Sequence, residues 1–368
     1  MTSNAAASQQ QPKRLYFYLV PNFSMSAFTA AVEALRLTNR VLGREAYQWP
    51  IVSKSGRSEV GSNGVSINVD MDLDTARRLT ADPAHASMVI VCSGISVEAF
   101  EDQQLFAWLR RINGQQGALG GICTGSWVLA RSGVMEGRRC TIHWENLPGF
   151  QERFPDVDVR SCLFDMHENI ATCAGGTAAL DMMLHIIGRR HGEKVVSKIC
   201  ELSLIDRIRP AEDRQRLPIG VRIGVQNHHL LTIIELMEAN IAEPLSLSEI
   251  SDVTRISRRH VERLFRQHLG RSPARYYLDV RLERARRLLR HSNLPIVEVA
   301  IAAGFVSASH FSKRYRERYQ VTPQADRREY EPTRTQQAIE PSDMVITEAA
   351  LREESELIAA AQDEALRV

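Results

Sequence analysis

The spacing of apolar residues changes once along the chain, and the change separates two kinds of domain. In the first two hundred residues, short apolar runs bounded by turn residues alternate with segments of helical periodicity. This order is typical of a mostly parallel sheet covered by helices on both faces. From about residue 225 onward the apolar residues recur only at helical spacing, so we expect an all-α domain to follow the α/β domain.

The first domain is expected to hold a flavodoxin-like sheet in which strands and helices alternate. Strands are predicted at 15–20, 88–92, 118–123, 139–143, 157–163 and 170–173. Helices are predicted at 24–42, at 98–113, at 125–131 and after the pair Gly175 and Gly176. The inward face of that last helix would carry Leu180, Met183, Leu184 and Ile187.

The second domain contains two predicted helix-turn-helix motifs that one long helix connects. The first motif pairs helices at 246–254 and 257–269, and a further helix at 230–240 precedes it. The second motif lies within 294–323, where Gly304 breaks an amphipathic run. The connecting helix at 276–290 carries an apolar stripe of Leu282, Ala285, Leu288 and Leu289.

These patterns divide the chain of 368 residues into five segments. We expect a disordered start (1–14), an α/β domain (15–205), a linker (206–222), a helical domain (223–330) and an acidic tail (331–368). The linker is predicted from its charge and its two prolines. Within the tail, an acidic run at about 344–366 is compatible with a helix, either as a solvated helix or as a contact for polymerase or for the basic domain.

Charge and cysteine usage narrow the function classes. The net charge of +2 hides an asymmetry, because 223–330 has 18 Lys and Arg against 12 Asp and Glu, whereas 331–368 has 3 against 9. The six cysteines include no C-x-x-C pair, which suits reduced thiols better than disulfides or a zinc site. The start lacks the apolar core of a signal peptide and no run is long enough to span a bilayer, so we expect a cytoplasmic protein without membrane contact.

The paired helix-turn-helix motifs resemble the AraC family of bacterial transcription regulators over about 225–328. The matching positions are Ser257, Val261, Arg263, Phe265, Pro273, Tyr277, Arg281, Ala285, Leu288, Leu289, Ile296, Val299, Ala300, Gly304, Phe305, Ser309, Phe311, Thr322 and Pro323. Gln320 departs from the pattern, because the family usually has glycine before the closing T-P. We expect this departure to affect a helix end without abolishing DNA binding.

The resemblance implies that two helices read double-stranded DNA. The first would present Arg258, Arg259, Glu262 and Arg263, and the second Ala308, Ser309, His310, Ser312 and Lys313. A guanidinium can grip guanine bidentately, and the two helices would enter successive major grooves roughly 10 base pairs apart. The alternative is that the arginines form only a solvated basic face. Three histidines of this domain are not expected to bind metal, because they lack cysteine partners: His260, His268 and His310.

The run G-G-I-C-T-G-S at 120–126 resembles the nucleophile turn of the class I glutamine amidotransferase-like, or PfpI-like, superfamily. Such a turn places a thiol at a helix N-terminus, where we expect the helix dipole to lower the pKa of Cys123. The N–H groups of Thr124 and Gly125 would bind an anion there. His143 follows at a spacing at which members of the superfamily also carry a histidine, so Cys123 and His143 could act as nucleophile and base.

Two departures weigh against catalysis at this turn. Hydrolases of the superfamily usually have histidine after the cysteine, where this chain has Thr124, and non-hydrolytic relatives often have glutamate where it has Ala27. Three readings stay open: a ligand pocket, a cysteine-dependent amidase or other hydrolase, and plain packing. We expect the pocket, with no enzymatic activity, cofactor or metal.

A PfpI-like domain joined to an AraC-type domain resembles the GlxA-type regulators across nearly all of 15–328. The supporting motifs are V-E-A-L-R-L-T-N (32–39), G-I-C-T-G (121–125), T-I-H-W (141–144) and A-G-G-T-A-A-L-D-M-M-L (174–184). The run N-F-S-M-S-A-F-T-A-A-V-E, together with G-R-E-A-Y-Q-W (43–49), is most similar to regulators of glycine betaine, carnitine and related quaternary-amine catabolism. Arginine-responsive regulators are also similar.

This resemblance implies an effector-responsive regulator, expected to be an activator that is dimeric through the sensor domain and works with RNA polymerase. The effector would be glycine betaine, dimethylglycine or carnitine, or alternatively arginine or another amino acid. Its carboxylate would meet the amides of Thr124 and Gly125, and its ammonium an aromatic face such as Trp144 or Phe23. Each of these aromatic residues could instead be ordinary core.

Overall fold

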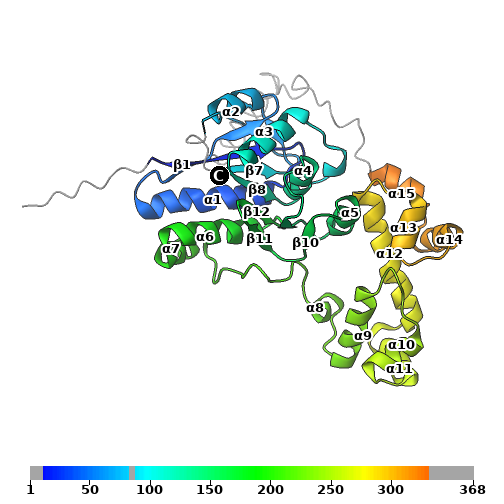
Figure 1. Ribbon diagram of the computed structural model, residues 1–368. Coiled ribbons are helices and arrows are strands. Elements are labelled where there is room, and N and C mark those ends of the chain that lie inside the picture. Colours follow the sequence, from blue (N-terminus) through cyan, green and yellow to red (C-terminus); the bar gives the residue numbers. More distant parts are fainter. Residues whose placement is uncertain (1–10, 83–87, 331–368) are drawn as a thin grey trace, which may run out of the picture. The chain divides into compact units, whose positions relative to one another are not determined.

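The computed structural model describes residues 11–82 and 88–330 (Figure 1). The acidic tail, its possible helix at 344–366 and the first ten residues lie outside the described residues. Two structural classes follow one another along the described chain, an α/β domain and then a helical domain, as the change of hydrophobic period predicts. None of the helices in this described part is long and apolar enough to cross a membrane.

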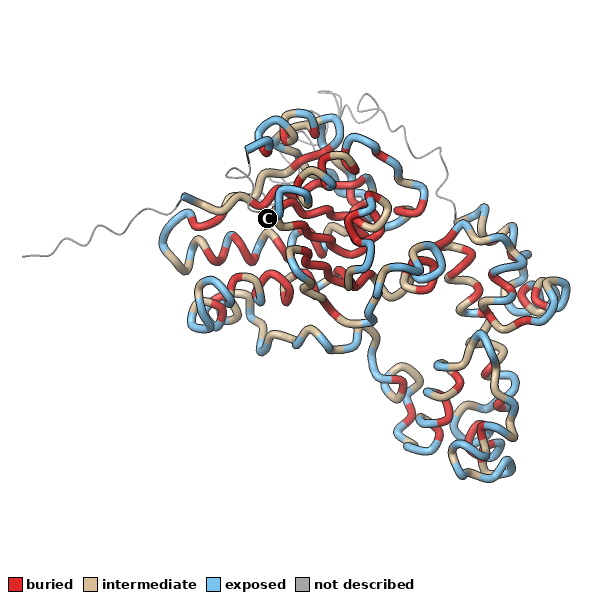
Figure 2. Tube along the Cα trace, viewed as in Figure 1, coloured by how far each residue is buried: buried red, intermediate tan, exposed pale blue. Residues whose placement is uncertain are grey.

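An eight-stranded sheet, mostly parallel, forms the centre of the α/β domain. Its strands are apolar because both faces are covered, and Figure 2 shows them as a buried layer. The order across the sheet is β11 (Phe164–His167), β12 (Ile170–Cys173), β8 (Ala118–Ile122), β7 (Met88–Cys92), β1 (Lys13–Leu19), β3 (Ile51–Ser53) and β6 (Met71–Asp72), with β2 (Tyr47–Gln48) also paired to β1. Only β11 runs antiparallel to its neighbour.

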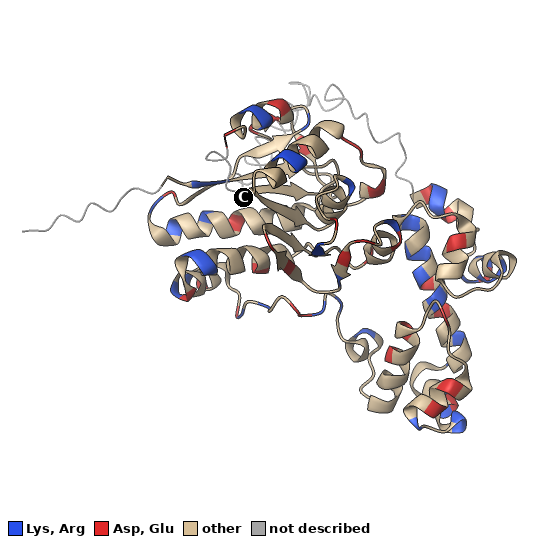
Figure 3. Ribbon diagram, in the orientation of Figure 1, with Lys and Arg blue, Asp and Glu red and all other residues tan. Residues whose placement is uncertain are grey.

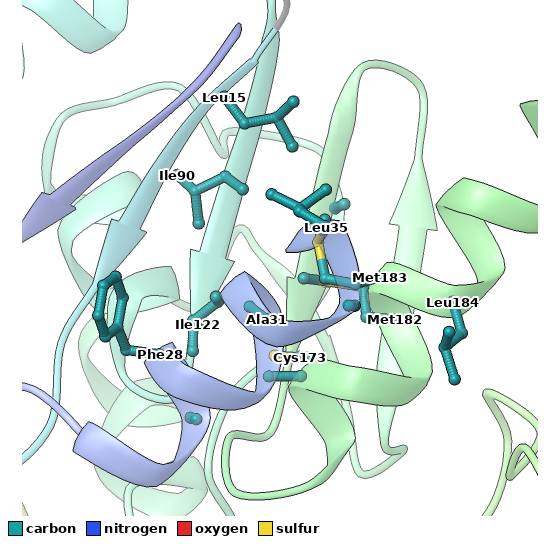
Figure 4. Packing of buried hydrophobic residues seen from close by; sticks show 14 of the residues in the cluster. Leu15, Phe28, Ala31, Leu35, Ile90, Ile122, Cys173, Met182, Met183 and Leu184 are labelled. Atoms are coloured by element: carbon teal, nitrogen blue, oxygen red, sulfur yellow. The ribbon is translucent and has the colours of Figure 1, made fainter. Parts of the chain in front are cut away.

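Helices cover both faces of this sheet and bury a separate apolar cluster on each. One face packs against α1 (Met25–Leu42), α6 (Ala178–His191) and α7 (Glu193–Ser203). Figure 4 shows Leu35 of α1 beside Met183 of α6, above Ile90 and Ile122 of the strands. The other face packs against α2 (Leu73–Leu79), α3 (Gln103–Gly114), α4 (Gly125–Arg131) and α5 (Leu147–Arg153).

Short irregular elements account for the differences from the predicted pattern. The missed strands β2, β3 and β6 have two or three residues each, too few for a period to be read from the sequence. The small sheets β9 (Arg139–Thr141) with β10 (Asp158–Arg160), and β4 (Glu59–Val60) with β5 (Ser66–Ile67), lie apart from the main one. The helix predicted at 98–113 divides into the 3-10 turn η2 (Val97–Ala99) and α3, because Asp102 caps α3 through the amides of Gln104 and Leu105.

The helical domain consists of two helix-turn-helix units on one long helix, α12 (Pro273–His291). The first unit contains α8 (Ile219–Ile223), α9 (His228–Ala239), α10 (Leu247–Thr254) and α11 (Arg258–Leu269). The second contains α13 (Ile296–Ala302), α14 (Ala308–Tyr319) and α15 (Pro323–Tyr330). Each unit buries its own core, and α12 contributes Tyr277 to the first and Leu282 and Leu288 to the second.

Candidate DNA interface and sensor site

The first candidate reading helix, α11, begins at a designed cap and turns one charged face outward. Ser257 accepts a hydrogen bond from the His260 amide at 3.4 Å, which fixes the start of the helix. Val261 and Phe265 on the opposite side are buried in the core of the unit. With the apolar side fixed, the polar side faces solvent, and Lys and Arg gather on α11 and α12 (Figure 3).

The predicted DNA contacts on α11 are exposed, and two of them have partners that orient them. Arg258, Arg259, Glu262 and Arg263 are all exposed. Arg263 approaches His260 Nδ1 with its Nη2 at 2.9 Å, and Arg258 donates to the Ser248 hydroxyl of α10. These contacts reduce the rotamer freedom that an arginine loses when it grips a base.

The second candidate reading helix, α14, repeats this design with fewer cations. Ser307 accepts from the His310 amide at 3.3 Å, while Phe311 and Tyr315 are buried on the inner side. Before the helix, Gly304 has a φ of 76°, and a Cβ there would collide with the Ile241 carbonyl, so the turn requires glycine. Ser309, His310 and Lys313 are exposed, whereas Ala308 and Ser312 are half-buried.

The predicted nucleophile turn joins β8 to α4 in a strained conformation. Cys123 has a φ of 60°, which a residue other than glycine rarely adopts, and its amide donates to the Cys173 carbonyl at 3.0 Å. Gly175, with a φ of 91°, lies against the cysteine, since a Cβ at Gly175 would come within 2.9 Å of Cys123 Sγ. The turn thus has the shape that the sequence predicts.

The chemistry of this turn differs from the prediction. Burial raises the pKa of the Cys123 thiol to about 12, and Cys173 adds to the rise, so the expected lowering by the helix dipole is outweighed. Only 8% of Cys123 and 2% of Thr124 are exposed. The Thr124 hydroxyl donates to the Gly94 carbonyl at 2.6 Å, and Gly125 is buried. The thiol is therefore protonated at neutral pH.

The predicted base lies beside a carboxylate that the sequence interpretation missed. His143 Nδ1 is 3.6 Å from Glu145 Oε2, and burial lowers the pKa of His143 while Glu145 opposes that fall. Among the described residues, no hydrogen bond joins His143 to the Cys123 thiol. Glu145 follows His143 by two positions in T-I-H-W-E, and this spacing is the signal that would have revealed it.

The two predicted aromatic ligands have different surroundings. Phe23 is 0% exposed and packs edge-to-face on Phe28, so it belongs to the core. Trp144 is half-buried, and the guanidinium of Arg216 lies 4.6 Å from its ring centroid. A cation thus already occupies the aromatic face predicted for an ammonium group.

Comparison with known proteins finds relatives over most of the chain. The model of the DJ-1/PfpI family matches residues 13–189, and a helix-turn-helix domain model matches residues 250–329. The HTH-type transcriptional regulator GbdR of Pseudomonas aeruginosa is 42% identical over 318 residues, which is 86% of this chain and 85% of that protein. The regulator CdhR of the same organism is 39% identical over 85% of this chain and 90% of its own length. The regulator GlxA of Rhizobium meliloti is 34% identical over 88% and 98%, respectively.

Proposed function

Because the chain belongs to the AraC family of transcription regulators that carry an N-terminal DJ-1/PfpI domain, we propose that it adjusts the expression of catabolic genes to a small cationic metabolite. The observation that carries this proposal is the pair of capped helices α11 and α14, each fixed by a buried inner face and polar outside. Two such helices suit successive major grooves of an operator.

We propose that the α/β domain binds its ligand without transforming it. A protonated, buried thiol is a poor nucleophile, and His143 pairs with Glu145 rather than with Cys123. A cysteine-dependent hydrolase would need a thiolate and a base within hydrogen-bond reach. The proposed ligand region therefore centres on His143, Trp144 and Glu145, with the turn from Cys123 to Gly125 as its rigid support.

For the effector we propose a small quaternary amine, namely glycine betaine, dimethylglycine or carnitine. The Trp144 ring already attracts a guanidinium, so it is suited to a trimethylammonium group, and Glu145 adds a negative charge nearby. The same guanidinium favours free arginine as the second candidate, because the ring accepts that group in the structure. Both candidates also present a carboxylate.

We further propose that the protein acts as a dimeric activator beside the chromosome in the cytoplasm, in contact with RNA polymerase. Dimerisation through the α/β domain would bring two helical domains to paired half-sites. An effector could then act only by binding one arrangement of these domains more tightly than the other.

Thermal unfolding of the full chain with each candidate tests the effector. A ligand at 100 times its dissociation constant should stabilise the domain that binds it by about 2.7 kcal/mol, so its unfolding midpoint rises. The control ligand is 3,3-dimethylbutyrate, which has the shape of glycine betaine without the positive charge and should give no shift. Equal shifts with both compounds would refute recognition of the cation.

A Cys123→Ser variant separates the sensor from an enzyme. We expect it to keep DNA affinity in an anisotropy titration and to change at most the effector response, because the thiol is protonated and buried. Turnover of an amide or aldehyde by the natural chain, lost in the variant, would establish the hydrolase instead.

A further inference from the structure

The segment that connects the two domains does not hang free but is fastened to the α/β domain. At its start, Arg209 forms hydrogen bonds through its backbone N, Nε and Nη2 with the buried carboxylate of Asp181, at 2.9, 3.0 and 2.6 Å. The same guanidinium donates to Thr177 Oγ1 at 2.6 Å. Hydrogen bonds to an ionised, buried partner are among the stronger ones, so Arg209 is a firm anchor.

A second anchor lies immediately before Arg216. The Gln215 side-chain amide nitrogen lies within hydrogen-bond distance of Thr141 Oγ1, the Ile142 carbonyl and the Cys162 carbonyl, at 3.0, 2.9 and 2.8 Å. Thr141 and Ile142 lead directly into His143 and Trp144. Gln215 therefore holds the next residue of the connecting segment beside the ring of Trp144.

Arg216 uses this position to place its guanidinium 4.6 Å from the Trp144 centroid, within the range of a cation–π interaction. Arg287 of α12 is a second, more distant guanidinium at 5.8 Å from the same centroid. Arg216 is half-buried, and burial lowers the pKa of its guanidinium, with the nearby cations Arg222 and Arg287 acting in the same direction. The contact therefore holds a partly desolvated cation that regains water when it leaves.

We propose that Arg216 is a built-in competitor of the effector, and that a quaternary ammonium or guanidinium ligand acts by displacing it from the ring of Trp144. This inference rests on the proposed effector class and adds the step that the effector controls. The geometry favours a local release, because Gln215 and Arg209 stay fastened while Arg216 leaves. The next residues are Leu217 and Pro218, and Pro218 precedes the first turn of α8.

The step has a direct route to the DNA-binding domain. Ile219 in α8 is buried with Leu230 and Ile233 of α9 in the core of the first helix-turn-helix unit. Three residues of chain thus separate the displaced side chain from that core. Fixing Arg216 on the ring restrains the start of α8, and displacing it removes the restraint.

Affinity measurements on the full chain test this competition. The natural chain, Arg216→Gln and the matched control Arg214→Gln are titrated with glycine betaine and with arginine by calorimetry. Arg214 is an exposed arginine of the same segment. We expect Arg216→Gln to bind about three- to tenfold more tightly, since the ligand no longer displaces a cation–π partner, and Arg214→Gln to match the natural chain. In a Trp144→Leu background, Arg216→Gln should give no such gain.

Hydrogen exchange in the same samples reports the release itself. Saturating ligand should accelerate exchange of the amides at 216–217 in the natural chain while those of α1 stay unchanged. If a ligand binds but Arg216→Gln has equal or weaker affinity, or the gain survives Trp144→Leu, the competitor role is refuted while the effector class stands. If neither chain binds any quaternary amine or arginine, both the effector class and the competitor role are refuted.

Discussion

The two helix-turn-helix units share one plan but differ in what holds and what reads. In both, a serine caps the reading helix and histidine is the third residue of that helix, at 260 and at 310. The first unit exposes four arginines on its reading helix, whereas the second exposes mainly serine, histidine and a lysine near its start. The first is thus equipped for direct readout of guanine, and the second for positioning.

The units also differ in how they are attached to α12. In the first, the Tyr277 hydroxyl donates to the Asn240 carbonyl and accepts from the Leu245 amide at 3.3 Å. In the second, Arg281 caps the end of α13 through the carbonyls of Ala303 and Gly304, at 3.0 and 2.6 Å, and stacks on Phe305. A neutral hydroxyl fastens the first unit, and charged groups fasten the second.

Asp326 is the centre of the charged attachment, and its removal should have the largest effect. The carboxylate is 1% exposed and accepts from Tyr315 of α14 at 2.5 Å, from Arg286 at 2.8 Å and from Arg290 at 2.7 Å. Asp326→Asn leaves two arginines without their counter-charge, but these are partly exposed and regain water. We therefore expect a loss of about 2–3 kcal/mol in the local stability of α14, at the low end for a broken buried pair.

Hydrogen exchange of the α14 amides measures this loss, which corresponds to at least about 30-fold faster exchange. Amides of α11 should be unaffected, because the first unit has its own core. The matched control is Asp252→Asn, an exposed aspartate of α10, for which no change is expected. Equal acceleration in both units would show that they open together.

The same carboxylate gives the second unit an acid limit. Burial acts to raise the pKa of Asp326, but hydrogen bonds from Tyr315, Arg290 and Arg286 lower it below its ordinary value. A group with a lowered pKa stabilises the fold above its unfolded pKa of about 4 and loses that effect as the pH falls through the folded value. Protection of α14 should fall below about pH 4 in the natural chain, and Asp326→Asn should lack this acid-dependent step.

Much of this plan is visible in the sequence because it depends on local signals. The capping serines, Gly304 and the apolar stripe of α12 each act within a few residues, so periodicity and caps predict the helices of both units. The buried strands β7, β8 and β12 appear within one residue of their predicted bounds for the same reason.

What the sequence could not predict depends on contacts between distant segments. The position of Arg216 on Trp144 depends on Gln215 reaching Thr141, which lies 74 positions earlier. The raised pKa of Cys123 comes from burial by surrounding elements, which a local argument from the helix dipole omits. Likewise, the burial of Phe23 follows from its packing on α1, not from its neighbours in sequence.

Arg263 tests the direct-readout side of the comparison. Arg263→Gln removes a guanidinium that His260 orients at 2.9 Å, and we expect about 1–3 kcal/mol less discrimination at one base pair of the operator. Competition binding against operators that vary at each position measures it. Arg266→Gln, an exposed arginine in the last turn of the same helix, is the control and should change only the salt dependence. An unchanged base preference in Arg263→Gln would remove Arg263 from the reading face.

The ends of the two reading helices give the smallest and most local contrast. Gly270 ends α11 with a φ of 64°, and Gln320 ends α14 with a φ of 61°, where its amide donates to the Arg316 carbonyl at 2.9 Å. Glutamine therefore keeps the left-handed helix end that the family pattern assigns to glycine, at a conformational cost of about 1 kcal/mol.

Gln320→Gly should relieve this cost and stabilise α14 by about 0.5 kcal/mol, because glycine loses more backbone entropy and the Gln320 side-chain contact with Glu317 disappears. Gly270→Ala should destabilise α11 by about 1 kcal/mol, and no atom lies close enough for steric collision to add to it. Exchange rates of the last-turn amides measure both changes. If Gln320→Gly instead destabilises α14, the glutamine side chain contributes more than the backbone strain it imposes, and the second unit has compensated for its missing glycine.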